Sequence, residues 1–154
     1  MTVEAAFRFS VIVTSPRYRV LIADQREDDR FFLKLVIRKR APLLEVIGEA
    51  ATGEHLVDYL AGSGPFADRG QHPFPHLVIM NWRLPLKDGA EILPWARAQN
   101  FPALKIAVMT VPVPETERSD AAHLGADYIF SKASNLQELE RILQVLVGDM
   151  ERGA

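Results

Sequence analysis

Leu77-Val78-Ile79-Met80-Asn81 is the stretch that decides the fold, because four consecutive apolar side chains end abruptly at a carboxamide. A strand that is apolar on both faces is typical of the interior of a parallel sheet that helices cover on both sides. The residues that follow at 85–89 read Pro-Leu-Lys-Asp-Gly and predict a turn before a helix. The stretch therefore predicts a central strand, a turn and a helix.

Four further apolar runs occur in the chain, and each leads into a longer stretch with helical spacing of its apolar residues. The runs cover residues 20–23, 43–47, 104–109 and 128–130. The stretches that follow them begin near Asp28, Thr52, Glu115 and Ser134. Strands that strictly alternate with helices predict a doubly wound α/β domain with a parallel sheet, right-handed crossovers and helices on both faces.

Local signals mark several boundaries. Thr52 is placed to cap a helix, and Gly125 is placed to end the helix that begins at Glu115. Ser134 and Gln137 have the spacing of a capping box at the start of the last helix. Residues 62–75 are rich in glycine and proline and predict a loop. We expect an N-terminal extension over 1–17, one domain over 18–148 and a tail over 149–154.

Composition limits the classes of function. The chain has 154 residues, of which 48% are apolar and 25% charged, which suits one globular domain. Its formal net charge of -2 offers no global positive field for nucleic acid or an anionic membrane. It has no cysteine, so disulfides, thiolate metal sites and cysteine nucleophiles are excluded. No apolar run is long enough to span a membrane, and we expect a cytoplasmic protein.

Polar side chains follow the ends of the predicted strands. Asp24 and Gln25 follow the first strand, Asn81 ends the third, Thr110 the fourth, and Ser131-Lys132 the fifth. In parallel sheets of this kind, ligands and chemistry gather outside the carboxyl ends of the strands. We therefore expect these side chains to lie on one rim of the domain.

On these motifs the chain resembles the receiver domain of two-component response regulators, the flavodoxin-like (βα)5 fold of the chemotaxis regulator. The matching segments are residues 20–24, 80–85 with 88–89, 108–110 and 125–132. The resemblance spans about 19–147 and implies a five-stranded parallel sheet in the order 2-1-3-4-5. The loop at 59–69 is also similar to a subgroup of stand-alone receivers, some of which serve phytochrome-type sensor kinases.

The resemblance implies roles for five positions. In the family, an aspartate at the end of the third strand takes a phosphoryl group from a kinase histidine, and two acids after the first strand help it to hold Mg²⁺. Asp24 matches the first acid, Thr110 the switch hydroxyl and Lys132 the phosphate-binding lysine. Asn81 stands in the phosphoacceptor position and Gln25 in the second acid position, so both depart from the pattern.

These departures predict a disabled phosphorylation site. The nitrogen lone pair of a carboxamide is delocalised and its oxygen carries no full charge, so Asn81 is not a nucleophile toward phosphorus. Asp24 remains as the one carboxylate of three, so Mg²⁺ binding is expected to be weak at most, and no other cofactor is expected. Arg83 is a candidate to reach Asp24 as a substitute cation. Ala133 replaces the proline that usually follows the lysine.

Three functions are open on this evidence. The first is a stand-alone pseudo-receiver that binds a sensor histidine kinase, of the phytochrome type for example, or another signalling protein, without accepting phosphate. The second captures phosphate on another acid or competes for kinase docking. The third is a flavin carrier or an enzyme on the same fold, which the strand ends disfavour because they offer no nucleophile–base pair and no phosphate cradle. We rank them in this order and do not expect an enzyme.

Structural roles compete with each of these interpretations. Asp24 and Lys132 can form an ion pair across strand ends, Asn81 can hydrogen-bond loop backbones or mimic a fixed neutral state, and the β-branched Thr110 suits a strand. Trp82 and Trp95 are expected to pack rather than to stack on a ligand. The four histidines lack metal-ligand spacing and are expected at the surface. These are His55, His72, His76 and His123.

Both ends of the domain carry apolar residues in excess of what a core requires. In the last helix, Ile142 and Val145 widen the stripe of Leu136, Leu139, Leu143 and Leu146, which predicts an exposed patch and a homodimer through this helix. Residues 7–13 alternate between apolar and other side chains. They are interpreted as an added edge strand, a partner-binding arm or a disordered tail, and as a possible cover for the patch.

Overall fold

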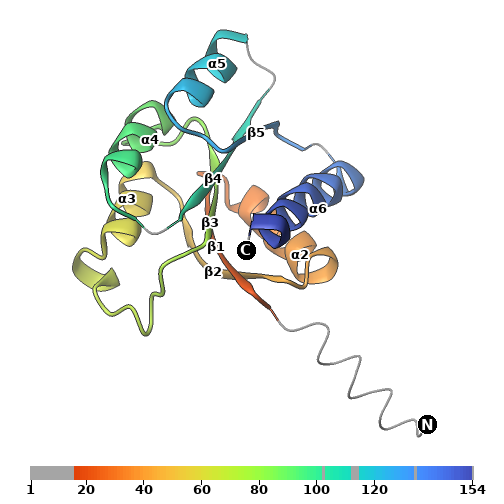
Figure 1. Cartoon of the computed structure of the whole chain (residues 1–154), viewed down its shortest axis with the longest axis horizontal. Helices are drawn as coiled ribbons and strands as arrows, with labels where there is room; N and C mark the ends of the chain where they lie inside the picture. Colours follow the sequence, from red (N-terminus) through yellow and green to blue (C-terminus); the bar gives the residue numbers. More distant parts are fainter. Residues whose placement is uncertain (1–15, 102, 112–114, 134, 154) are drawn as a thin grey trace, which may run out of the picture.

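The computed structural model describes residues 16–101, 103–111, 115–133 and 135–153. Its five strands form one parallel sheet in the order β2-β1-β3-β4-β5, which confirms the predicted topology (Figure 1). The strands are β1 Tyr18–Ala23, β2 Leu44–Ala50, β3 Leu77–Asn81, β4 Lys105–Thr110 and β5 Tyr128–Ser131. The helices are α2 Glu27–Arg40, α3 Gly53–Ala61, the 3-10 helix η1 Gly64–Phe66, α4 Gly89–Ala98, α5 Glu115–His123 and α6 Leu136–Gly153.

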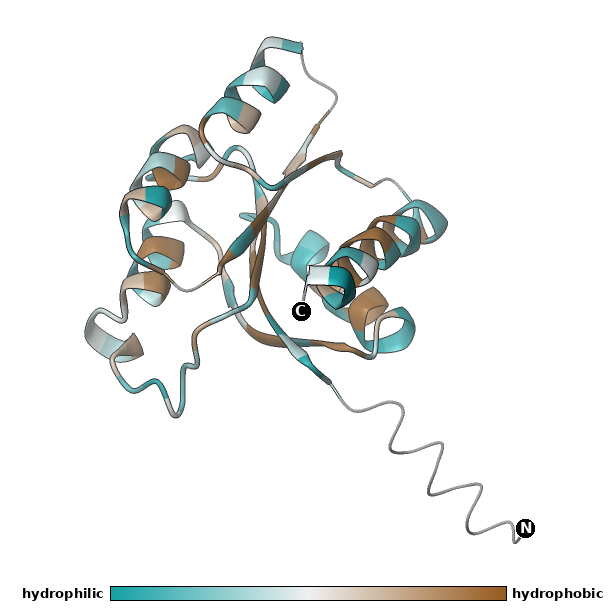
Figure 2. Ribbon diagram, viewed as in Figure 1, coloured by the Kyte–Doolittle hydropathy of each residue, from teal (hydrophilic) through white to brown (hydrophobic). Residues whose placement is uncertain are grey.

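Helices cover both faces of the sheet, with α3, α4 and α5 on one face and α2 and α6 on the other (Figure 1). The hydrophobic sides of α2 and α6 face the sheet and each other, as Figure 2 shows. The four apolar residues that open β3 are each at most 2% exposed, because alternate side chains enter the two layers of the core. The apolar run that predicted a central strand therefore serves both cores.

Two of the three predicted helix ends are described. The Thr52 hydroxyl accepts the backbone N–H of His55 at 3.0 Å, as expected of an N-cap. Gly125 has a φ of 111°, a left-handed conformation that glycine adopts without strain, two residues after α5 ends. Ser134 lies outside the described residues, but the side chain of Asn135 accepts the N–H of Glu138 at 2.9 Å and caps α6.

The prediction of an exposed apolar patch on the last helix is wrong for Ile142. Ile142 is only 2% exposed, because it packs between the sheet and α2, whereas Val145 and Leu136 are 46% and 45% exposed. These two residues stand nine positions apart and form no contiguous surface on their own. Helix α6 also continues through Gly153, so residues 149–153 belong to it and not to a separate tail.

The loop at 62–75 is held down by a cation and by aromatic rings. The guanidinium of Arg69 donates to the carbonyls of Tyr59 and Leu60, both at 2.8 Å, and lies over the ring of Phe74. The ring of Tyr59 contacts those of Phe66 and His72, and its hydroxyl donates to the carbonyl of Pro73 at 3.0 Å. The loop is therefore a packed layer over α3.

The expected surface placement of the histidines is correct for His123 alone. His55, His72 and His76 are half-buried. His55 stacks on Phe66, His72 meets the same ring edge to face, and His76 accepts a hydrogen bond from the backbone of β1. In the described ranges, no group of three or more histidine and acidic residues is arranged to hold a metal ion. None of the helices described is long and apolar enough to cross a membrane.

His76 predicts a loss of stability in mild acid. Its Nδ1 accepts the backbone N–H of Arg19 at 2.9 Å, which only a neutral ring can do, and burial together with the charge of Arg19 lowers its pKa below 6.5. A depressed pKa contributes stability above the unfolded value, and this contribution is lost as pH falls through the folded value. We expect the urea concentration at the midpoint of unfolding to decrease as the pH is lowered from about 7 to about 5.

The variant His76→Asn is the control for this prediction, because its side-chain oxygen also accepts the Arg19 N–H but does not titrate near neutrality. Its unfolding midpoint should vary less with pH than that of the wild-type chain over the same range. Parallel pH profiles for the two proteins would show that His76 does not carry the effect.

Candidate functional site

The sheet brings the polar strand ends together on one rim. Asn81 is the last residue of β3, Thr110 the last of β4, and Asp24 and Lys132 directly follow β1 and β5. A cavity of about 50 Å³ at this rim is lined by Asp24, Asn81 and Lys132, together with residues of α2 and α6. Three of the side chains expected to share the rim therefore share one cavity.

Lys132 is held by two carboxylates. Its Nζ donates to Oδ2 of Asp24 at 2.8 Å and contacts Oδ2 of Asp29 at 2.7 Å. Burial alone would lower the pKa of Lys132, but the two hydrogen bonds and charges outweigh burial and raise it. The ammonium therefore stays charged, and its attraction to Asp24 and Asp29 fixes its position.

Asp24 is itself oriented by the chain around it. Its second carboxylate oxygen, Oδ1, accepts the backbone N–H of Arg26 at 2.9 Å. The backbone carbonyl of Asp24 accepts a hydrogen bond from the Arg30 guanidinium at 2.7 Å. The Arg30 guanidinium continues to Glu49 on β2 at 2.8 Å. Asp24 thus has both carboxylate oxygens engaged, one by a cation and one by the backbone.

Asp29 is the site residue that the sequence interpretation missed. It lies in the first turn of α2, where three consecutive acidic residues stand near the positive end of the helix. The signal that could have found it is position: the first turn of a helix that follows a rim strand faces the same rim. Gln25, by contrast, is exposed and does not line the cavity.

Arg83 does not substitute as a cation at Asp24. Its guanidinium forms an ion pair with Glu117 on α5, on the other side of Asn81, and its side chain is 72% exposed. A second small cavity lies there, lined by Asn81, Arg83, Thr110 and Glu117 among others. The expected contact is wrong because the loop after β3 directs Arg83 toward β4 and α5 rather than toward β1.

Thr110 is buried, with 3% of its surface exposed, and its hydroxyl points toward the neighbouring strand. The hydroxyl donates to the carbonyl of Phe130 at 3.5 Å, a weak bond by distance. The backbone carbonyl of Thr110 accepts the N–H of Lys132 at 2.5 Å. The residue therefore ties β4 to the segment that carries the lysine.

The loop between β3 and α4 is fixed by two close glycine contacts. The N–H of Gly53 donates to the carbonyl of Pro85 at 3.0 Å, and that of Gly89 donates to the carbonyl of Trp82 at 2.7 Å. A Cβ atom on Gly53 would lie 1.6 Å from the Lys87 carbonyl oxygen, and one on Gly89 would lie 2.2 Å from the Trp82 ring. Both glycines are required for the loop to reach α3 and α4.

The two tryptophans pack as expected. Trp82 is 6% exposed in the core on the α3 and α4 side of the sheet. Trp95 is half-buried, and its ring meets that of Phe101 edge to face at 5.7 Å. Neither presents a face to the rim cavity formed around Lys132.

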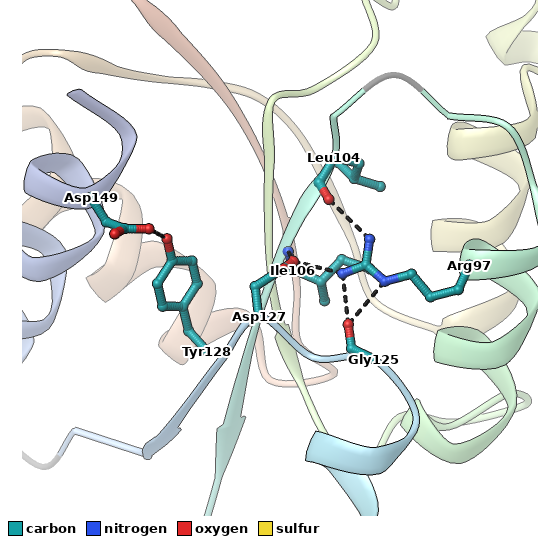
Figure 3. A network of polar contacts seen from close by, with 7 residues as sticks. All are labelled: Arg97, Leu104, Ile106, Gly125, Asp127, Tyr128 and Asp149. Carbon is teal, nitrogen blue, oxygen red and sulfur yellow. Dashed lines mark hydrogen bonds and ion pairs between the residues drawn. The ribbon is translucent and has the colours of Figure 1, made fainter. Parts of the chain in front are cut away.

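A second polar cluster, centred on Arg97 and Asp127, lies where β4 and β5 begin, at the end of the sheet opposite the rim (Figure 3). Arg97 of α4 donates to the carbonyls of Leu104 and Gly125, and to Oδ2 of Asp127 at 2.6 Å. The same carboxylate accepts the N–H of Ile106 on β4 at 2.8 Å. One guanidinium therefore links α4, the start of β4 and the segment that leads into β5.

The comparisons with known proteins agree with the fold. Residues 20–144 match the family model of the response regulator receiver domain, and the chain therefore belongs to that family. It is 26% identical over 139 residues to the response regulator Rcp1 of Synechocystis sp. (strain ATCC 27184 / PCC 6803 / Kazusa), covering 84% of this chain and 85% of that protein. Receivers of this family are signalling domains of two-component systems.

Solved structures show the same fold. The phosphorylated cyanobacterial phytochrome response regulator RcpA superposes with a TM-score of 0.72 at 20% identity, covering 84% of this chain and 91% of that chain. The response regulator RPA3017, described in red light signalling of R. palustris, gives a TM-score of 0.72 at 22% identity, covering 84% and 90%.

Proposed function

We propose that this receiver signals through protein contacts without accepting a phosphoryl group at position 81. The observation that carries the proposal is the rim itself: β3 ends in Asn81, and the neighbouring Lys132 is already bound by Asp24 and Asp29. A carboxamide supplies no nucleophilic oxygen for phosphoryl transfer. The positive charge of Lys132, which would otherwise stabilise a transferred phosphate, is neutralised by Asp24 and Asp29.

The donors present do not fit the Mg²⁺ site that the family implies. Mg²⁺ needs carboxylate oxygens that remain open to it and to its waters. Asp24 and Asp29 both engage Lys132, and positions 25 and 81 carry carboxamides instead of carboxylates. We therefore assign no metal step to this chain and treat the lysine as a substitute for the cation.

We further propose a sensor histidine kinase as the partner, of the phytochrome type. The support is the similarity to Rcp1 and to RcpA, which is described as a phytochrome response regulator. A receiver that cannot be phosphorylated would either compete for the docking surface of the kinase or signal by binding a partner protein. Such a partner belongs to the cytoplasm, where we place this protein as well.

Treatment with a small phosphodonor tests the phosphate-free mechanism. Acetyl phosphate or phosphoramidate with Mg²⁺ should leave the intact mass of the protein unchanged, because the acceptor carboxylate is absent. The measurement is mass spectrometry under conditions that label an ordinary receiver run in parallel. A stoichiometric gain of one phosphoryl mass on the wild-type chain would contradict the proposal.

The same experiment separates the second candidate function, capture of phosphate on another acid. Asp29 favours this candidate, because its carboxylate lies on the rim beside Lys132. If a phosphoryl mass appears on the wild-type chain and is lost in Asp29→Asn, the domain is an ordinary phosphate-responsive receiver with a displaced acceptor. Labelling that survives in Asp29→Asn directs the search to Asp24.

A further inference from the structure

A groove of about 600 Å³ runs between α2 and the outer edge of β2, away from the rim. Phe31 and Leu35 of α2 line one wall, and they are 64% and 38% exposed. They are four residues apart and lie on one face of the helix. Leu44, Val46 and Ile47 of β2 line the other wall. The exposed large apolar side chains are thus on the helix wall, whereas Leu44 of the strand wall is buried and Val46 and Ile47 are half-buried.

The floor of this surface is an open strand edge. Among the described strands, β2 is last in the sheet order and pairs with β1 alone. The outer edge of such a strand presents backbone N–H and C=O groups that can pair with a further strand. An extended segment is therefore the kind of occupant that matches both the strand edge and the exposed apolar side chains of α2.

The described part of the chain begins beside this groove. Pro16, the first described residue, is one of its lining residues. The N–H groups of Arg17 and Tyr18 both donate to the carbonyl of Leu43, at 2.8 and 2.9 Å, so the chain reaches β1 beside the start of β2. The preceding residues 7–13 read Phe-Arg-Phe-Ser-Val-Ile-Val, with apolar side chains at every odd position.

We propose that residues 7–13 occupy the groove as an edge strand antiparallel to β2. The lengths agree, because β2 has 7 residues, and the four links from Val13 to Arg17 span roughly 13 Å when extended. The crossing from the outer edge of β2 to β1 needs two strand spacings, roughly 10 Å. Phe7, Phe9, Val11 and Val13 would then cover Phe31 and Leu35. This inference does not rest on the proposed function.

Hydrogen exchange on the full chain tests the proposal. In Phe7→Asp/Phe9→Asp, the amides of residues 44–50 should exchange on the order of tenfold faster than in wild type, because the apolar seat of the added strand is lost. The control Ala6→Asp/Ser10→Asp carries the same added charge on the opposite face and should exchange like wild type. Equal exchange in all three proteins, or equal acceleration in both variants, would overturn the proposal.

Engineered disulfides distinguish this chain's own segment from a second copy. The chain has no cysteine, so Leu35→Cys can be paired with cysteine at Phe7, Phe9 or Val11 in turn. In the control pair, Ser119→Cys on α5 takes the place of Leu35→Cys. At least one of the three pairs should link within a monomer, and the control pair of Phe9→Cys with Ser119→Cys should not. Linked dimers, equal linkage in the control, or no linkage in any pair would overturn the proposal.

Discussion

The variant Asn81→Asp/Gln25→Asp is expected to gain a phosphoryl group from acetyl phosphate in the presence of Mg²⁺, whereas the wild-type chain is not. The first substitution supplies the nucleophile, and the second restores a carboxylate beside Asp24 for the metal. We expect Asn81→Asp alone to label at least about tenfold more slowly, the range found when support around a bound metal is removed. Intact mass against time at equal Mg²⁺ measures both rates.

The structure adds a third arm to this experiment. Asp29 holds Lys132 at 2.7 Å, so its removal should free the lysine for an incoming phosphate and accelerate labelling of the double variant. The matched control is Asp28→Asn, because Asp28 is the exposed neighbour in the same helical turn. If Asn81→Asp labels as fast as the double variant, the role assigned to Gln25 is wrong. If Asp29→Asn and Asp28→Asn have equal effects on labelling of the double variant, the role assigned to Asp29 is wrong as well.

Gly53→Ala is expected to destabilise the domain by about 3 kcal/mol or more, which is large for a single methyl group. The added Cβ would lie 1.6 Å from the carbonyl oxygen of Lys87, a backbone atom that cannot rotate away. The helix α3 and the loop at 85–89 would have to separate, and the hydrogen bond from Gly53 to Pro85 would be lost. Urea unfolding measures the change in the free energy of unfolding.

Gly148→Ala is the matched control, because it makes the same chemical change inside α6. A Cβ there would meet only the end of the Arg152 side chain, at 3.5 Å. Alanine is favoured over glycine in a helix by about 0.5–1 kcal/mol, so this variant should be slightly more stable than wild type. Comparable losses of stability in the two variants would show that close backbone approach is not the cause at Gly53.

The sequence predicted the fold because the pattern of strands is local and repeated. Apolar runs that end in polar residues identify each strand of a parallel sheet without reference to any other element, and all five strands are found where these runs lie. The convergence of Asp24, Asn81 and Lys132 followed from the same pattern, since parallel strands end on one side. These parts of the site needed no knowledge of side-chain direction.

The parts that failed depend on where a side chain points. Arg83 pairs with Glu117 and not with Asp24, because the loop after β3 turns toward α5. Ile142 is buried because α6 packs against α2 as well as the sheet, so its apolar stripe has to be wider than one sheet face requires. Asp29 was missed because a helical turn, and not a strand end, brings it to Lys132. Each of these is a tertiary fact that spacing along the chain does not contain.

The packing of α2 against α6 has a consequence for the order in which the protein matures on the ribosome. Val36 and Ile37 of α2 are buried in the same cluster as Leu143 and Leu146 of α6. At usual rates of synthesis, the interval between Arg40 and Leu136 lasts on the order of 10 s, and α6 must then still clear the exit tunnel. During that time, α2 alone covers its side of the nascent sheet, and the part of that face that α6 will cover stays exposed. A chaperone that binds exposed apolar helices would therefore bind α2 before α6 packs against it. Premature termination of translation within α6 would leave an aggregation-prone chain with this face exposed.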